Sequence, residues 1–130
     1  MNKNSDFKSK KELSEKLENR LIDFSVNIIR ISEEVPVTKA GNHLSGQLVR
    51  SATSPALNYG EAQSAESRAD FIHKMKVCLK ELKETLVCQK IIYRKPMIEN
   101  LELLESTIRE NNELISIFVS SINTASGNRS

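Results

Sequence analysis

The chain has 130 residues, enough for one domain with a single hydrophobic core. Hydrophobic residues make up 38% and charged residues 28%, which is typical of a soluble helical protein, and no apolar run is long enough to cross a bilayer. The net charge of +2 is too small by itself to indicate nucleic-acid binding. The polar first residues predict that the chain carries no secretory signal, and Cys78 and Cys88 are too far apart on one predicted helix to pair. These features predict a cytoplasmic protein with reduced thiols.

The first predicted helix covers about residues 10–34. Its apolar residues recur at spacings of three and four, as in the core face of a bundle helix: Leu17, Leu21, Phe24, Ile28, Ile31 and Val35. A second apolar stripe, Ile22, Val26 and Ile29, lies more than about 100° away around the same helix. Single exposed apolar residues are common, but an aligned stripe forms a patch. We therefore predict that the second stripe belongs to an oligomer interface.

The second predicted helix covers about residues 43–66. Pro36 ends the preceding helix, Gly41 is expected to take a positive φ, and Asn42 is expected to be the N-cap. Pro55 lies inside this segment and cannot donate a backbone hydrogen bond, so it should bend or locally break the helix. The expected inner face holds Leu44, Leu48, Ala52 and Ala56.

Two further helices follow, the third from Ser67 and the fourth over about residues 98–123. Ser67 and Asp70 form a capping-box pattern at the start of the third helix, and Lys95-Pro96 ends it. The expected core face of the third helix is Ile72, Met75, Leu79, Leu82, Leu86, Gln89 and Tyr93. That of the fourth helix is Leu101, Leu104, Ile108, Asn111, Ile115, Phe118 and Ile122, with the Asn111 amide fixing the register.

Four helices of similar length joined by short loops predict an all-α fold, an antiparallel up-down-up-down four-helix bundle whose second helix is bent near Pro55. No segment has the two-residue period of a strand. We expect the bundle to cover residues 9–123. The polar ends, residues 1–8 and 124–130, are expected to be disordered.

The residues that usually carry catalysis or metal binding do not form a recognisable site. Asp70 and His73 form a single Asp-x-x-His pair, whereas a di-iron bundle needs two Glu-x-x-His pairs and two further carboxylates. The two cysteines lie in apolar helix without a nearby base, which is typical of buried structural thiols. We find no phosphate-binding loop and no serine elbow. The sequence therefore indicates no enzyme, no catalytic residue, no metal, no cofactor and no small-molecule substrate.

The charge distribution is more informative than the net charge. Residues 61–95 hold eight Lys and Arg against five Asp and Glu, whereas residues 96–130 hold two against five. Five basic residues follow one stripe of the third helix: Lys76, Lys80, Lys83, Lys90 and Arg94. The acidic fourth helix or water could neutralise this basic stripe. Alternatively, the basic stripe could bind the phosphate backbone of RNA or DNA. Aromatic residues do not alternate with the lysines, so base stacking is not indicated.

A set of polar residues on the two central helices has two interpretations. Its members are Arg50, Asn58, Glu61, Arg68, Glu81 and Glu84. A hydrogen-bonded network between the helices is one interpretation, since packed polar groups need partners. A functional surface on the assembled oligomer is the other.

The central part of the chain resembles the 23S rRNA-intervening-sequence proteins of bacteria. The resemblance lies in Gln47-Leu-Val-Arg50-Ser-Ala-Thr-Ser54, Asn58, Glu61, Ser67-Arg68-x-Asp70-Phe71, Lys74 and Leu79-Lys80-Glu81-x-x-Glu84-Thr85, and it extends over about residues 15–122. It implies a four-helix bundle that assembles as a homopentamer, with no established biochemical role and with nucleic-acid binding suspected.

A related branch of that family comprises the accessory proteins of diversity-generating retroelements, which are more basic than this chain. The Val87-Cys88-Gln89 segment also lacks the aromatic residues that the family often has there. The resemblance therefore implies fold and assembly more strongly than activity. The alternatives are a protein-interaction scaffold and a retroelement accessory protein.

Overall fold

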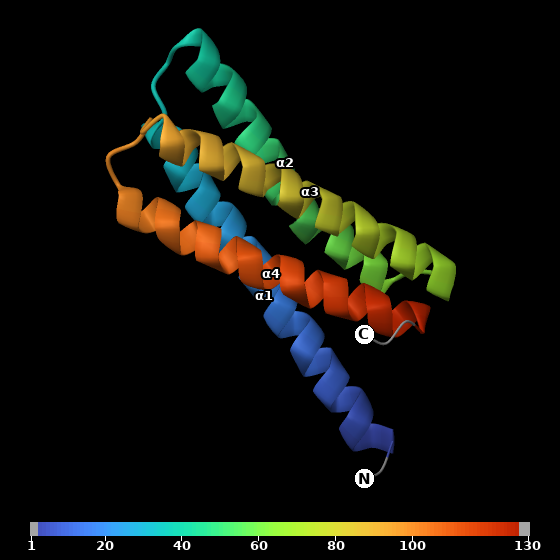
Figure 1. The fold of residues 1–130 in the computed structure, drawn as a ribbon. Coiled ribbons are helices and arrows are strands. Elements are labelled where there is room, and N and C mark those ends of the chain that lie inside the picture. The colour runs from blue at the N-terminus through green and yellow to red at the C-terminus, as the bar shows by residue number, and fades with distance from the viewer. Residues whose placement is uncertain (1–2, 128–130) are drawn as a thin grey trace.

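The computed structural model describes the backbone of residues 3–127 and the side chains of residues 8–127. Four helices make up this part of the chain: α1 (Lys3–Glu34), α2 (Lys39–Gln63), α3 (Arg68–Arg94) and α4 (Leu101–Ser126). The α1–α2 and α3–α4 connections lie at one end of the molecule, and the α2–α3 connection lies at the other (Figure 1). Each helix packs against its neighbours in a closed ring. The predicted all-α antiparallel four-helix bundle is thereby confirmed.

The predicted core face of α1 is confirmed. Leu21, Phe24, Ile28 and Ile31 are at most 1% exposed, and they meet the buried side chains of the other three helices. At one end of this core the Tyr59 ring of α2 packs edge-on against Phe118 of α4, with 5.8 Å between the ring centroids. One continuous apolar core therefore holds the bundle together.

The helix starts are set by side-chain caps. Ser67 is confirmed as the N-cap of α3, because its Oγ accepts from the Asp70 backbone N–H at 3.0 Å. The reciprocal bond of a capping box is shifted by one residue, since the Asp70 carboxylate accepts from the N–H of Glu66 and not from that of Ser67. The predicted Asn42 cap of α2 is wrong. Thr38 caps this helix and accepts from the Gly41 N–H at 2.9 Å, so α2 begins at Lys39.

The prediction of a positive φ at Gly41 is also wrong, since Gly127 alone has one among the described residues. Gly41 lies in helical backbone under the chain reversal, where a Cβ atom would collide with the Pro36 carbonyl oxygen. The glycine is required by close approach of two backbone segments, and not by backbone conformation.

α2 continues through Pro55 without interruption, so the helix is not broken there. Pro55 is buried, and its carbonyl accepts from the Cys78 thiol of α3 at 3.6 Å. The predicted inner residues Leu48 and Ala52 are buried as expected. A bend near Pro55 stays a prediction.

The core face of α3 differs slightly from the predicted one. Cys78, Thr85 and Ile92 are buried, whereas Tyr93 is 43% exposed. The predicted stripe lies to one side of the buried line, because Leu79 and Leu86, which were counted as core, are only partly buried. The same holds for α4, where Leu114 is buried and Leu101 is partly exposed.

The two chain ends carry more helix than the sequence indicates. α1 begins at Lys3 and α4 ends at Ser126, inside the segments 1–8 and 124–130 that were expected to be disordered. Residues 1–2 and 128–130 lie outside the described residues. The division into a bundle over 9–123 and disordered ends therefore stays a prediction.

The bundle is not equally tight all round. α1 and α4 have the least contact of the four neighbouring pairs, and the first part of α1 diverges from the other helices (Figure 1). Arg20 links α1 to α4 along this contact, which we call the α1–α4 seam. It donates to Glu110 at 2.6 and 3.0 Å and to Glu113 at 3.2 Å. The hydrogen bond with Glu110 is the main reason that the pKa of Arg20 is raised.

Candidate nucleic-acid interface

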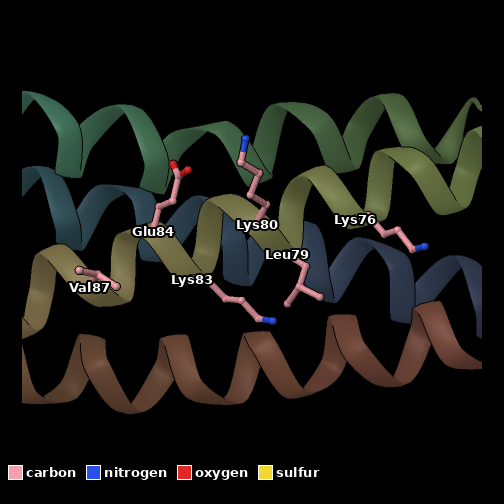
Figure 2. A pocket seen from close by; sticks show the side chains of 6 residues that line it. All are labelled: Lys76, Leu79, Lys80, Lys83, Glu84 and Val87. Carbon is pink, nitrogen blue, oxygen red and sulfur yellow. The ribbon is translucent and has the colours of Figure 1, made fainter.

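The five basic residues of the predicted stripe all lie on the outer face of α3, and all are exposed: Lys76, Lys80, Lys83, Lys90 and Arg94. We refer to them as the basic face. Figure 2 shows part of it, with Lys83 extending toward the α4 side of α3 and Lys80 toward the α2 side. The opposite face of α3 is buried in the core. This packing fixes the rotation of α3 and directs the five basic side chains toward solvent.

The acidic fourth helix does not neutralise the basic face by direct pairing. Within the described part of the chain, none of the five basic groups lies within 4.0 Å of a carboxylate oxygen. Two of the α4 carboxylates, Glu110 and Glu113, are bound to Arg20 of α1 instead. Glu84, four residues after Lys80, is bound to Arg50 of α2. The basic face is therefore available to an anionic partner or to solvent.

A shallow depression of ≈ 450 Å³ lies on this face, and α3 alone lines it with Lys76, Leu79, Lys80, Lys83, Glu84 and Val87 (Figure 2). Val87 is 58% exposed between the lysines. No aromatic ring lies in the depression. The hydroxyl of Tyr93, at the end of α3, donates to Glu105 of α4 at 3.3 Å. The surface offers charge and a small apolar floor rather than a stacking platform.

The structure brings only half of the predicted polar set together. Arg50 of α2 donates to Glu81 and to Glu84 of α3, at 3.2 Å in each case, and this ties the two helices. Asn58 donates instead to Ser54, one turn earlier in its own helix. Glu61 and Arg68 are exposed. The contacts made by Arg50 fit the interpretation as a structural link between helices.

A second polar cluster lies inside the core. The Asn111 amide donates to the Leu82 carbonyl at 3.0 Å and to Gln89 Oε1 at 2.8 Å, and the Gln89 amide donates to Thr107 at 3.1 Å. Gln89 and Asn111 are 0% exposed. The helical spacing predicts that both amides lie on core faces. The burial of this polar pair between α3 and α4 can therefore be expected from the sequence.

One buried polar contact was missed by sequence reasoning. Thr85 of α3 donates to Ser51 of α2 at 2.8 Å, and both side chains are fully buried. Small hydroxyl residues occur throughout α2, so the sequence does not show which of them faces α3. The contact adds a polar link to the tightest helix pair of the bundle.

Within the described residues, the titratable and nucleophilic side chains are dispersed over the bundle. Burial raises the pKa of the Cys78 thiol to about 12 and also raises the pKa of Cys88. The hydrogen bond from Lys74 is the main cause of the lowered pKa of Asp70. Among the described residues no group of three or more His, Cys, Asp and Glu could hold a metal ion. His43 and His73 are exposed on separate helices.

The second apolar stripe of α1 lies open on the bundle surface. Ile22, Val26 and Ile29 are each about 40% exposed (43%, 42% and 40%). Their exposure makes the stripe a candidate surface for association with another chain.

Residues 3–127 contain no helix that is apolar and long enough to span a bilayer.

Comparison with protein families gives one match, which covers most of the bundle. The family model with the description "23S rRNA-intervening sequence protein" matches residues 11–120 of this chain. No curated protein matches the chain significantly.

The fold is similar to a crystal structure from Bacteroides thetaiotaomicron, described as a protein with unknown function from the S23 ribosomal protein family. The two chains superimpose with a TM-score of 0.74 and share 31% sequence identity. The match covers 82% of this chain and 97% of that chain.

Proposed function

Since the chain belongs to the 23S rRNA-intervening sequence protein family, we propose that it is a non-enzymatic, cytoplasmic, self-associating bundle that binds the phosphate backbone of RNA or DNA along the basic face of α3. The single observation that supports the binding proposal is the set of five exposed cations that have no carboxylate partner among the described side chains. Like charges on one helix face repel each other, and a polyanion relieves that repulsion.

The geometry of the basic face suits a polymer better than a small anion. Lys76 and Arg94 are 18 residues apart, which corresponds to about 27 Å along a helix at 1.5 Å per residue. Five cations over that length can meet several phosphates in succession. Recognition would be independent of sequence, since the face offers ammonium and guanidinium groups and no aromatic platform.

The binding proposal is tested by charge reversal on the basic face. Lys76→Glu combined with Lys83→Glu should weaken binding to fluorescent RNA and DNA oligonucleotides of any sequence. Removing two phosphate contacts should flatten the slope of log K against log salt by about 1.4 to 1.8. Fluorescence anisotropy over a series of salt concentrations measures both effects.

The matched control is Lys11→Glu, which changes the charge by the same amount per substitution at an exposed position of α1, away from the basic face. It should leave most of the affinity intact. Absence of any salt-dependent binding by the unmodified protein contradicts the proposal. A loss with Lys11→Glu that is half as large in free energy as that of the double variant shows a response to net charge alone and contradicts the assignment to α3.

Self-association is supported by the open apolar stripe of α1. Ile22, Val26 and Ile29 lie on the side of the helix away from the core, where a monomer leaves them in water. The family resemblance favours a homopentamer, in which each copy would bury this stripe. Light scattering on a sizing column at micromolar concentration measures the mass. Val26→Glu should reduce it, and a monomer mass for the unmodified protein rejects the proposal.

A protein-interaction scaffold is the second candidate, and the same stripe favours it. A scaffold would use the stripe to bind a different polypeptide. Treatment of a purified complex with nuclease separates the two proposals: a complex held by RNA or DNA falls apart, whereas a complex held by the stripe survives. A reverse transcriptase as the surviving partner would place the chain in the retroelement branch.

A further inference from the structure

A cleft opens at the end of the bundle where α1 diverges. Its volume of ≈ 870 Å³ lies within the range of about 300–1,000 Å³ that is usual for small-molecule sites. All four helices contribute to it. The apolar wall is formed mainly by Leu13, Leu17, Tyr59, Phe71, Met75 and Ile117.

Three of the four α4 residues that line the cleft are small: Ser121, Thr124 and Ala125. Arg20 of α1 is bound to Glu110 and Glu113 of α4. The first part of α1 diverges from the other helices (Figure 1). On the same side of α4, Ser121 and Ala125 line the gap, one turn apart. Side chains of this size leave the space unfilled, whereas protein interiors are normally packed to the density of organic crystals. An apolar space of this volume can take up an apolar guest.

Three of the polar side chains that line the cleft are hydrogen-bonded to one another. The Tyr59 hydroxyl donates to Ser14 Oγ at 3.2 Å, and Ser14 Oγ donates to Gln63 Oε1 at 2.8 Å. A guest therefore meets a mainly apolar wall, in which the Tyr59, Ser14 and Gln63 side chains are occupied with one another. This favours a hydrocarbon chain over a sugar or a nucleobase.

The charges at the cleft all have one sign. Lys10, Lys16 and Arg20 are among its lining residues, and no carboxylate is. Arg20 is bound to α4, which leaves two ammonium groups that make no ion pair within the described residues. The rim is therefore complementary to a negatively charged head group.

We propose that this cleft binds a medium- to long-chain carboxylate. The hydrocarbon chain lies between α1 and α4 against Leu17 and Ile117, and the carboxylate lies near Lys10 and Lys16. By touching both helices the ligand holds the loosest seam of the bundle together. No residue of the basic face lines the cleft, so this inference is independent of the proposed nucleic-acid binding.

Calorimetric titration of the full-length protein with octanoate, decanoate and dodecanoate below their micellar concentrations tests the proposal. Affinity should rise with chain length, by up to about fourfold per methylene, because each added methylene leaves water. Dodecyltrimethylammonium has the same chain and the opposite charge, and it should bind more weakly than dodecanoate. No binding of dodecanoate, or equal binding of the cationic analogue, overturns the proposal.

Matched variants locate the site. Ser121→Leu fills the cleft and should abolish dodecanoate binding, whereas Ser120→Leu adds the same side chain at the neighbouring exposed position and should not. Lys16→Glu should weaken binding about three- to tenfold, and Lys11→Glu should have little effect. Ala125→Leu replaces Ser121→Leu if circular dichroism shows that the latter has lost helix. Equal losses in a variant and its control overturn the assignment to the cleft.

Discussion

The inner and outer faces of α3 differ in whether their side chains have partners within the bundle. On the inner face, polar and apolar side chains alike are buried against neighbours, and Thr85 and Gln89 have hydrogen-bond partners on α2 and α4. On the outer face the basic residues are exposed, and within the described chain they have no ionic partner.

The difference shows where to look for stability and where to look for binding. Buried polar groups without partners are costly, so the inner face is arranged to satisfy nearly all of them. Exposed charges carry no such requirement, and their arrangement is free to serve a partner. Changes on the inner face should therefore alter folding, and changes on the outer face should alter association.

Thiol reactivity should give the largest contrast between the faces. Cys78 lies on the inner face with its pKa raised to about 12 from the usual 9.0, so at pH 8 a thiol reagent should modify it more than about a hundredfold slower than the unfolded chain. Val87→Cys places a thiol on the outer face, where it should react rapidly. Reaction with a chromogenic disulfide measures both rates. Fast modification of folded Cys78 would show that the inner face opens readily.

The same shift predicts a pH dependence. The unfolded thiol ionises above pH 9, while the folded thiol keeps its proton until the pH approaches 12. The unfolded state therefore binds fewer protons in this window, and stability should fall as the pH rises through it. The urea midpoint measured between pH 9 and 11, with Cys78→Ala as the control for this contribution, tests the sign.

Truncation of a core side chain should have the next largest effect. Leu82→Ala on the inner face should lower the free energy of unfolding by about 2–5 kcal/mol, because it removes buried methyl groups and leaves a cavity. Val87→Ala on the outer face removes a similar amount of carbon, and it should change that free energy by less than about 0.5 kcal/mol. Urea denaturation followed by circular dichroism measures both. Similar losses for the two variants would contradict the division between the faces.

A smaller loss is expected from the buried amide cluster. Gln89→Leu should cost about 1–3 kcal/mol, because the Asn111 amide loses an acceptor and Asn111 Oδ1 already has no hydrogen-bond partner. Gln89→Leu combined with Asn111→Leu removes both amides and should recover part of that loss. A double-mutant cycle in urea measures the coupling. Zero coupling would mean that the two amides do not act as a unit.

The smallest effect on stability is expected on the basic face. Lys76→Glu combined with Lys83→Glu should leave the urea midpoint essentially unchanged, since the two ammonium groups contact no carboxylate within the described residues. The same protein should show the altered nucleic-acid binding described above. A large drop in the midpoint would mean that these lysines serve the fold.

A structural feature of this chain can be predicted from the sequence when it depends on residues that are close together along the chain. The core face of α1 and the N-cap at Ser67 depend on residues three or four apart, and both are confirmed. The start of α2 was misplaced, because the need for glycine at position 41 comes from the Pro36 carbonyl packed above it. Tyr93 was placed in the core face, although Ile92 is the buried residue there. Adjacent helical positions are rotated by about 100° from each other. Where apolar residues are frequent, their periodicity does not show which of two adjacent positions faces the core.

For the candidate site, sequence spacing was sufficient to align the basic residues on one side of α3. It could not show whether α4 neutralises them, because ion pairing depends on which helix faces which. The separation of Glu110 and Glu113 from the basic face results from the arrangement of the bundle, which turns them toward Arg20.

The sequence by itself determined the number of helices, the chain reversals, the main core stripes and the family, because these follow from local periodicity, caps and a continuous motif. Only the tertiary structure decided which charges are paired, which polar groups are buried and where the bundle opens. Those features depend on the distances between different helices. A helix carries its periodicity in its own residues, but its neighbours determine what each side chain meets.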